Sequence, residues 1–203
     1  MIFKSFFEYT NWCKSTELAL FSSVPRLAVS YQIPLIWWGE NAALQVGDVN
    51  VMGKNGWDGN SLRNMNTLSG GDFSWLLSEE IKTNHILQYL YPTVEEMDRA
   101  KLQVVFLGYF WKVWSLRDNG NYAALRGLQI RDDKPWESGD PAGVTSLDED
   151  WVTLNQMIKY LKYGFGRVSD YVNEDIRNER MSREQGIELL KKYDGKCSPK
   201  YIR

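Results

Sequence analysis

Two short apolar runs constrain the fold of this chain more than any other feature. The first, IPLIWW at 33–38, stops abruptly at Gly39, and the second, LQVVFLGYF, spans 102–110 with Gly108 near its end. Such short, nearly continuous runs are typical of buried strands in parallel sheets, which are covered on both faces. Helical patterns lie before and after them. The sequence therefore predicts an α/β fold around a parallel sheet.

Apolar residues at helical spacing predict a helix over 18–31. Pro25 lies inside that stretch, so the helix either kinks there or has Pro25 in its first turn. Capping-box pairs, in which a Ser or Thr precedes a Glu or Gln by three residues, mark helix starts at Thr93 and Ser182. The other helical segments are expected at 73–91, 111–125, 149–163, 167–180 and 183–193.

The organisation along the chain suggests two parts. Residues 46–72 are rich in Gly and Asn, and 129–150 carry several Asp residues, so we expect two long polar loops. We expect the α/β part, with strands near 33–38 and 102–108, in residues 1–128, and the acidic loop with a helical region in 129–203. Two strands make a poor parallel sheet, because parallel sheets usually contain more strands. The sequence therefore predicts that the chain contains only part of an α/β domain.

Bulk composition excludes several function classes. The chain has 203 residues, of which 43% are hydrophobic and 25% charged, as in ordinary soluble proteins. A net charge of -2 argues against broad binding to nucleic acid or membrane surfaces, which requires a basic field. No apolar run approaches the roughly 20 residues that a membrane span needs. Without a secretory signal or a paired-cysteine pattern, a cytoplasmic location is expected.

Nine Trp and eleven Tyr residues are unusual and could suggest stacking on sugars or bases. Several of them lie in apolar runs, where a large aromatic ring simply fills space. We therefore expect Trp37, Trp111 and Trp114 to belong to the core. His85 is the only histidine and has no recognisable catalytic or metal-binding partners, so we expect a surface or structural role. No metal site is predicted.

A Gly-Glu-Asn sequence at 39–41 follows the first expected strand. Open α/β sheets bind ligands beyond the carboxyl ends of their strands. Gly39 would allow close backbone approach, Glu40 could hold a metal or a nucleotide hydroxyl, and Asn41 could contact a carbonyl or a phosphate. A simple turn would explain Gly39 and Asn41 equally well.

A second candidate motif, G-F-G-R, occupies residues 164–167. Two glycines before a helix can expose backbone N–H groups to an anion, and Arg167 would add positive charge. Taken alone, the motif is better explained by a tight junction between two helices. On that interpretation Arg177 and its neighbouring arginines lie on a solvated face.

Three stretches together resemble the N-acetyl sugar amidotransferase family: IPLIWWGEN, VVFLGYF and YLKYGFGRVSDYVNEDIRNERMSREQGIELLKKYDGKC. This family belongs to the PP-loop ATP pyrophosphatase superfamily and acts in bacterial surface-polysaccharide and nonulosonate pathways. The resemblance covers most of the chain and is densest at 24–41 and 160–197. It implies an adenine-nucleotide α-hydrolase-like, Rossmann-like parallel sheet with a helical C-terminal region.

The resemblance also implies a reaction. ATP, bound with Mg²⁺ in the complete enzyme, would adenylate the amide oxygen of a nucleotide-linked N-acetyl sugar and release pyrophosphate. Ammonia would then displace AMP and leave an acetamidino group. The ammonia would come from separate glutaminase and cyclase-like subunits, and no nucleic acid or membrane span is involved.

The family's functional residues are carried over position by position. Glu40 and Asn41 match the G-E-N motif and are the expected catalytic contacts. The residues expected to bind nucleotide or substrate are Gly39, Lys162, Gly164, Gly166, Arg167 and Arg177. Further matches to the family's C-terminal motif are Asp170, Ile176, Arg183 and Asp194.

The chain departs from the family in its phosphate loop. The family carries S-G-G-K-D-S after its first strand, whereas SGGDFS at 69–74 follows polar residues and has Asp72 one place early. We interpret it as a turn in which Asp72 caps a helix at Phe73. The chain is therefore expected to be a C-terminal part of such an enzyme, and inactive alone. The alternatives are a non-catalytic subunit or binding module that needs a partner chain, or another PP-loop enzyme such as a tRNA-thiolating one.

Overall fold

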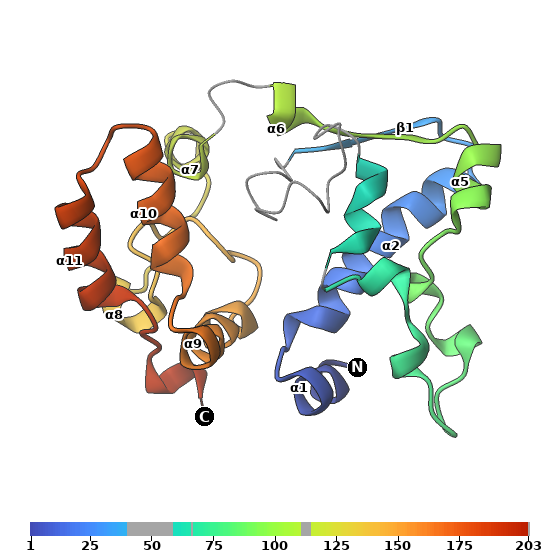
Figure 1. The fold of residues 1–203 in the computed structure, drawn as a ribbon, viewed down its shortest axis with the longest axis horizontal. Coiled ribbons are helices and arrows are strands. Elements are labelled where there is room, and N and C mark those ends of the chain that lie inside the picture. Colours follow the sequence, from blue (N-terminus) through green and yellow to red (C-terminus); the bar gives the residue numbers. More distant parts are fainter. Residues whose placement is uncertain (40–58, 66, 111–114, 203) are drawn as a thin grey trace. The chain divides into compact units, whose positions relative to one another are not determined.

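The computed structural model describes residues 1–39, 59–65, 67–110 and 115–202 (Figure 1). The chain divides into two compact units. Unit 1 comprises Met1–Tyr9 with Cys13–Trp114, and unit 2 comprises Thr10–Trp12 with Ser115–Arg203. Among the described helices, none combines the length and the hydrophobicity that a membrane span requires.

Unit 1 is built on α1 (Ile2–Tyr9) and the longer α2 (Cys13–Ser30). Pro25 lies inside α2, so of the two alternatives the structure has Pro25 in the helix interior rather than in a first turn. The short helix α5 (Val94–Arg99) begins at the predicted capping box: the Thr93 hydroxyl accepts the Glu96 N–H, and the Glu96 carboxylate accepts the Thr93 N–H. Local polar signals therefore predicted this helix start correctly.

The two predicted strands pair in parallel, β1 (Leu35–Trp38) with β2 (Gln103–Phe106). A mostly helical chain with this small parallel sheet is compatible with an α/β fold. The second strand is shorter than expected, because residues Leu107–Phe110 turn into the short helix α6. Within the described residues the sheet has two strands.

The expectation that β1 is buried on both faces, with Trp37 in the core, is wrong. Side chains alternate across a strand, and only Ile36 and Trp38 pack into the apolar clusters of unit 1. Leu35 and Trp37 are 40% and 61% exposed on the opposite face. Trp111 and Trp114, also expected in the core, lie outside the described residues.

The predicted helix over 73–91 is also wrong. The structure has three single 3-10 turns there, η3 (Ser74–Leu76), η4 (Thr83–His85) and η5 (Leu87–Tyr89). Leu76, Ile86 and Tyr89 are buried in the same apolar cluster as Leu18 of α2. At 3.6 residues per turn, Leu76 and Tyr89 would lie about 140° apart around one straight helix, so the three side chains would not all face that cluster, and the chain bends instead. His85 is exposed, and its Nδ1 accepts the Lys82 N–H, which agrees with a structural role.

The SGGDFS segment forms a turn, as predicted. It follows the 3-10 helix η1 (Gly59–Asn64) rather than a strand, and its first three residues form η2 (Ser69–Gly71). Asp72 Oδ1 accepts the N–H of Ser74, the first residue of η3, at 2.8 Å. Hydrogen bonds from Ser74 lower the pKa of Asp72. The strand, turn and helix N-terminus that a pyrophosphate loop requires are therefore not assembled here.

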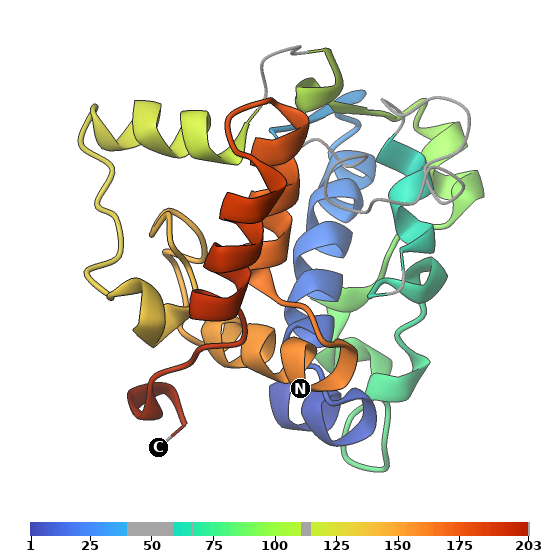
Figure 2. The ribbon, with the colours of Figure 1, turned by 60° about the vertical axis from the view of Figure 1, so that its left-hand side comes forward.

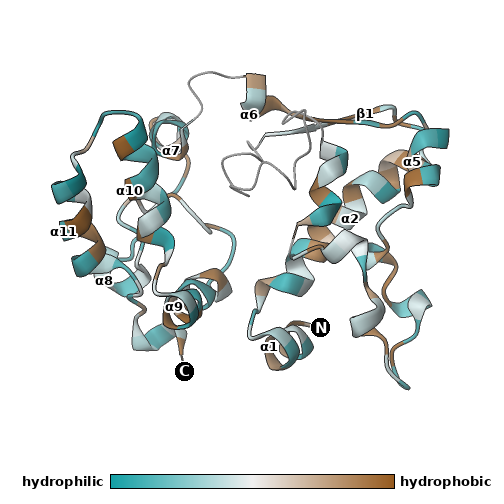
Figure 3. Ribbon diagram, viewed as in Figure 1, coloured by the Kyte–Doolittle hydropathy of each residue, from teal (hydrophilic) through white to brown (hydrophobic). Residues whose placement is uncertain are grey.

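Unit 2 is helical, as predicted for the C-terminal region. Its elements are α7 (Leu116–Ala124), α8 (Pro135–Ser138), α9 (Trp151–Tyr163), α10 (Arg167–Arg177), α11 (Arg183–Tyr193) and η6 (Pro199–Tyr201). Helices α10 and α11 lie side by side in both views (Figures 1 and 2). A Cβ at Gly186 would come within 2.5 Å of Val172 Cγ1, so glycine allows the two helices to approach this closely. Hydrophilic residues predominate on α10 (Figure 3).

Candidate functional site

The G-F-G-R junction between α9 and α10 is organised by a carboxylate of the same chain. Asp194 accepts the Gly166 N–H at 2.9 Å, the Val168 N–H at 3.2 Å and the Ser169 hydroxyl at 2.9 Å. The aspartate is 8% exposed. It therefore occupies the N-terminus of α10, where free N–H groups and the helix dipole favour a negative charge.

Both glycines of the motif have a structural explanation. Gly164 ends α9 in the left-handed conformation, with φ of 78°, where a side chain would be strained. A Cβ at Gly166 would lie 2.6 Å from Asp194 Oδ1, so only glycine lets the carboxylate approach. The N–H of Gly166, predicted to face a ligand anion, thus already has an anionic partner in this structure.

Sequence reasoning did not find this role for Asp194, although a signal was present. Asp194 follows the last residue of α11, where the helix dipole disfavours a carboxylate. A carboxylate at that position indicates that hydrogen-bond donors elsewhere in the chain stabilise its charge. The partner, the start of α10, lies more than twenty residues earlier in the chain.

Next to this junction, a buried polar cluster connects the acidic loop to α10. Asp140 is 5% exposed and accepts the Ala142 N–H at 3.0 Å and the Thr145 hydroxyl at 2.6 Å. The Tyr171 hydroxyl donates to Thr145 Oγ1 at 3.0 Å. Burial, and next the charge of Asp140, raise the pKa of Tyr171, so its hydroxyl stays protonated and remains a donor.

Arg167 lines a small void beside this cluster. The void, of about 10 Å³, is bordered by Arg131, Ser138, Asp140, Thr145, Ser146, Val152, Thr153, Gln156 and Arg167. Among the described residues Gln156 Oε1 is buried without a hydrogen-bond partner. A polar void of this size holds about one water molecule. Arg167 therefore faces a nearly filled polar centre rather than a cavity of substrate size.

A third polar centre, the Arg131 hub, consists of Arg131, Asp133, Asp150, Lys200 and Tyr201. Arg131 donates to Asp133 Oδ2 at 2.9 Å, to Asp150 Oδ1 at 2.7 Å and to the Tyr201 hydroxyl oxygen at 2.8 Å. Burial alone would raise the pKa of Asp133, but hydrogen bonds from Lys200, Tyr201 and Arg131 outweigh it and lower that pKa to about 2. The hub connects the start of the acidic loop to its end and to η6.

The structure brings together part of the predicted site. Lys162, Gly164, Gly166 and Arg167 lie at one junction, whereas Arg177 lies at the opposite end of α10, about 15 Å away along the helix axis at 1.5 Å per residue. Gly39 is exposed at the end of β1 in unit 1.

The two predicted catalytic residues, Glu40 and Asn41, lie outside the described residues. The binding roles assigned to the other residues stay predictions. In the described ranges, no group of three or more His, Cys, Asp and Glu side chains is placed to hold a metal ion.

Neither of two places in the described ranges where ATP phosphates could be sought, the Ser69 turn and the start of α10, is an open phosphate cradle. The Ser69 turn follows a 3-10 helix, and the start of α10 is taken by Asp194. No residue of the described ranges is therefore assigned to ATP or to its Mg²⁺.

Comparison with known proteins gives a family match in the C-terminal region. Residues 144–203 match the family described as LPS biosynthesis protein WbpG-like, C-terminal domain. No curated protein gives a significant match to the chain. The matched range contains Thr145, Arg167 and Asp194, whereas Asp140 and Arg131 precede it. The match connects the C-terminal region of the chain with lipopolysaccharide biosynthesis.

Proposed function

We propose that this chain takes part in the ATP-dependent amidination of N-acetyl sugars during the biosynthesis of lipopolysaccharide O-antigen or a related glycan. The observation that carries the proposal is the match of residues 144–203 to the C-terminal domain of WbpG-like LPS biosynthesis proteins. The resemblance of the G-E-N and G-F-G-R motifs to sugar amidotransferases supports it further.

The proposed reaction exchanges the carbonyl oxygen of an acetamido group for nitrogen. An amide oxygen is a poor leaving group, and this is why the reaction is coupled to ATP. Ammonia, from a glutaminase acting with a cyclase-like protein, supplies the nitrogen. The product is an amidine, which is protonated and positively charged at neutral pH.

A specific observation favours a second candidate, a subunit or binding module that requires a partner chain. In the described residues the parallel sheet has two strands, and Leu35 and Trp37 are exposed on one face. Parallel sheets are normally covered on both faces. A partner that extends and covers the sheet would account for this exposure.

Both candidates can be tested in one reconstitution. The chain is incubated with ATP, Mg²⁺, ammonium and a panel of nucleotide-linked N-acetyl sugars, with and without a glutaminase, a cyclase-like protein and a chain that carries the family's phosphate loop. Mass spectrometry then follows the replacement of oxygen by NH in the sugar. Product in any mixture supports the amidotransferase. No product in every mixture, combined with a stable stoichiometric complex with another protein, supports the binding module.

Arg167→Ala tests the site assignment. If Arg167 contacts the sugar or its phosphates, amidination should fall by about tenfold or more, the effect of losing one charged contact worth about 1.4 kcal/mol. Arg99→Ala removes the same charge from the exposed end of α5 and is the matched control. A wild-type rate for Arg167→Ala would remove this residue from the site.

A further inference from the structure

A cavity of about 630 Å³ adjoins the Arg131 hub in unit 2. Besides the hub, its lining consists of Gln129, Ile130, Asp132, Glu137 and Leu147. These residues come from separate stretches of the chain, the acidic loop near both of its ends and η6. The volume lies in the range of about 300–1,000 Å³ that is usual for small-molecule sites.

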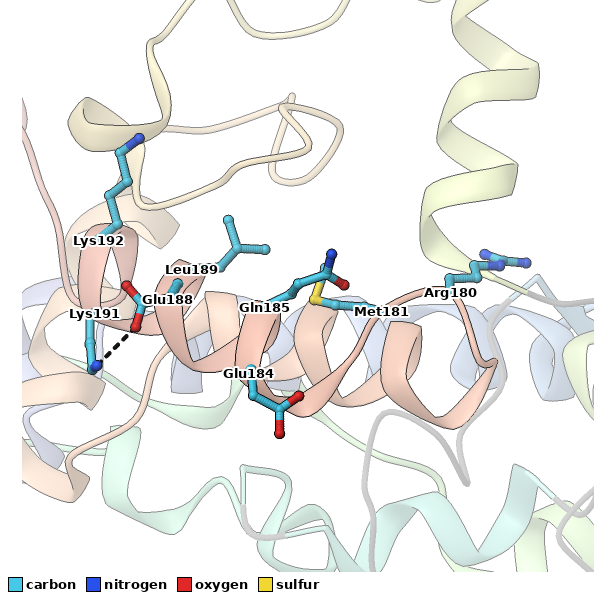
Figure 4. A pocket seen from close by; sticks show the side chains of 8 residues that line it. All are labelled: Arg180, Met181, Glu184, Gln185, Glu188, Leu189, Lys191 and Lys192. Atoms are coloured by element: carbon cyan, nitrogen blue, oxygen red, sulfur yellow. Dashed lines mark hydrogen bonds and ion pairs between the residues drawn. The ribbon is translucent and has the colours of Figure 1, made fainter.

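The walls of this cavity are preorganised. The side chains of Arg131 and Asp133 are 9% and 8% exposed, and several hydrogen bonds hold each of them. A groove of about 880 Å³ along α11 provides the contrast (Figure 4). All of its lining residues come from 180–192, on α11 or just before it, and most are long charged side chains. The cavity at the hub is therefore the better-built site.

The charged side chains that line the cavity limit the class of ligand that it can bind. Four carboxylates and two cationic side chains line the cavity, which leaves an excess of two negative charges. Asp133 and Asp150 are paired with the cations of the hub. Asp132 is exposed and has no ion pair or hydrogen bond among the described residues. The Glu137 carboxylate accepts one hydrogen bond among them, from the Lys134 N–H. Such a cavity attracts a cation and repels a phosphate.

The remaining lining residues suit a sugar ring. Ile130 and Leu147 are 43% and 37% exposed and offer an apolar surface. The Gln129 amide can both donate to and accept from hydroxyl groups, and the free carboxylate oxygens can accept from them. A pyranose presents the complementary groups, a C–H face and a rim of hydroxyls.

We propose that this cavity binds a sugar that carries a protonated nitrogen. The cationic group pairs with Asp132 and Glu137, and the ring packs on Ile130 and Leu147. The inference rests on the proposed function for the natural ligand: the acetamidino group is such a cation, whereas the N-acetyl group of the precursor is neutral, and the nucleotide diphosphate of either molecule lies outside the cavity. The site thus prefers the product sugar to the substrate sugar.

The test measures binding directly, without catalysis. The full chain is titrated at slightly acidic pH with glucosamine, with N-acetylglucosamine as the neutral ring and with ethanolamine as a cation without a ring. We expect glucosamine to bind at least about tenfold more tightly than either control probe, and its affinity to fall as salt is added.

The variants locate the site. Asp132→Asn combined with Glu137→Gln should bring glucosamine down to the affinity of N-acetylglucosamine, while each replacement keeps the size of the side chain. Glu184→Gln on exposed α11 loses a charge as well and should change nothing.

Equal binding of the three probes, or glucosamine binding that survives the double substitution, overturns the inference. If the chain amidinates sugars but does not bind glucosamine, the inference fails and the proposed function stands. If the chain binds glucosamine but amidinates no sugar under any condition, the inference stands and the proposed function fails.

Discussion

The two units of the molecule are stabilised by different kinds of interaction. Unit 1 contains both of the larger apolar clusters found in the described residues, one around Leu18 and Phe106 and the other around Ile36 and Val104. Unit 2 instead buries polar centres, which are built on Arg131, Asp140 and Asp194. Apolar packing depends on area and shape, whereas a buried hydrogen-bond network depends on direction and on charge.

This difference indicates where binding chemistry can reside. The acidic loop of unit 2 contains little regular structure, so side chains must satisfy its backbone groups. Arg131 donates to the Ser146 carbonyl, and Asp140 accepts the N–H groups of Ala142 and Thr145. Loops held in this way can present polar groups with defined geometry. Unit 1 is thus expected to respond mainly to changes of volume, and unit 2 to changes of charge and pH.

The largest effect is expected for Leu18→Ala in unit 1. Leu18 is 0% exposed, and removing it leaves a cavity in the apolar cluster that should reduce the free energy of unfolding by about 2–5 kcal/mol. Urea denaturation, monitored by tryptophan fluorescence, measures this loss in the free energy of unfolding. Leu20→Ala on the same helix, at 54% exposure, should cost less than about 0.5 kcal/mol. Equal losses for the two variants would contradict an apolar core around α2.

The next largest effect is expected for Asp194→Ala in unit 2. The substitution removes the cap of α10 and leaves buried N–H groups without a partner, which should cost about 2–3 kcal/mol. Amide hydrogen exchange should show the loss of protection at residues 166–169. Asp170→Ala, whose side chain is 52% exposed, is the control and should change protection little. Unchanged exchange in Asp194→Ala would refute the cap.

A smaller loss, of about 1–2 kcal/mol, is expected for Arg131→Lys. Lysine keeps the charge but cannot reproduce the fork that bonds Asp133, Asp150 and Tyr201 together. Thermal unfolding compared with Arg183→Lys, an exposed site, isolates the hydrogen bonds from the charge. A hub held by charge alone would tolerate both substitutions equally.

The smallest expected effect is a loss of folding stability at low pH. Because the folded pKa of Asp133, about 2, lies below its ordinary value of 3.8, its carboxylate stabilises unit 2 above about pH 4. This contribution should be lost as the pH falls toward 2. After solvent screening it is on the order of 1 kcal/mol. The wild type should therefore lose more stability than Asp133→Asn over that interval, and parallel pH profiles would exclude the effect.

Local signals in the sequence predicted much of the fold. The parallel pairing of β1 and β2, the capping boxes at Thr93 and Ser182, and the three C-terminal helices are all confirmed. Each depends on residues within a few positions of one another or on a continuous apolar run. For the same reason the SGGDFS segment could be identified as a turn before its contacts were known.

The sequence alone thus determined both strands and most of the helices, because helix periodicity, capping and strand composition are properties of neighbouring residues. Only the tertiary structure decided which face of β1 is buried, why residues 73–91 bend into 3-10 turns, and that Asp194 occupies the helix start predicted for a ligand anion. These depend on contacts between residues far apart in the chain. The two glycines before α10 showed that backbone N–H groups there could face an anion, but they could not show that the protein supplies its own.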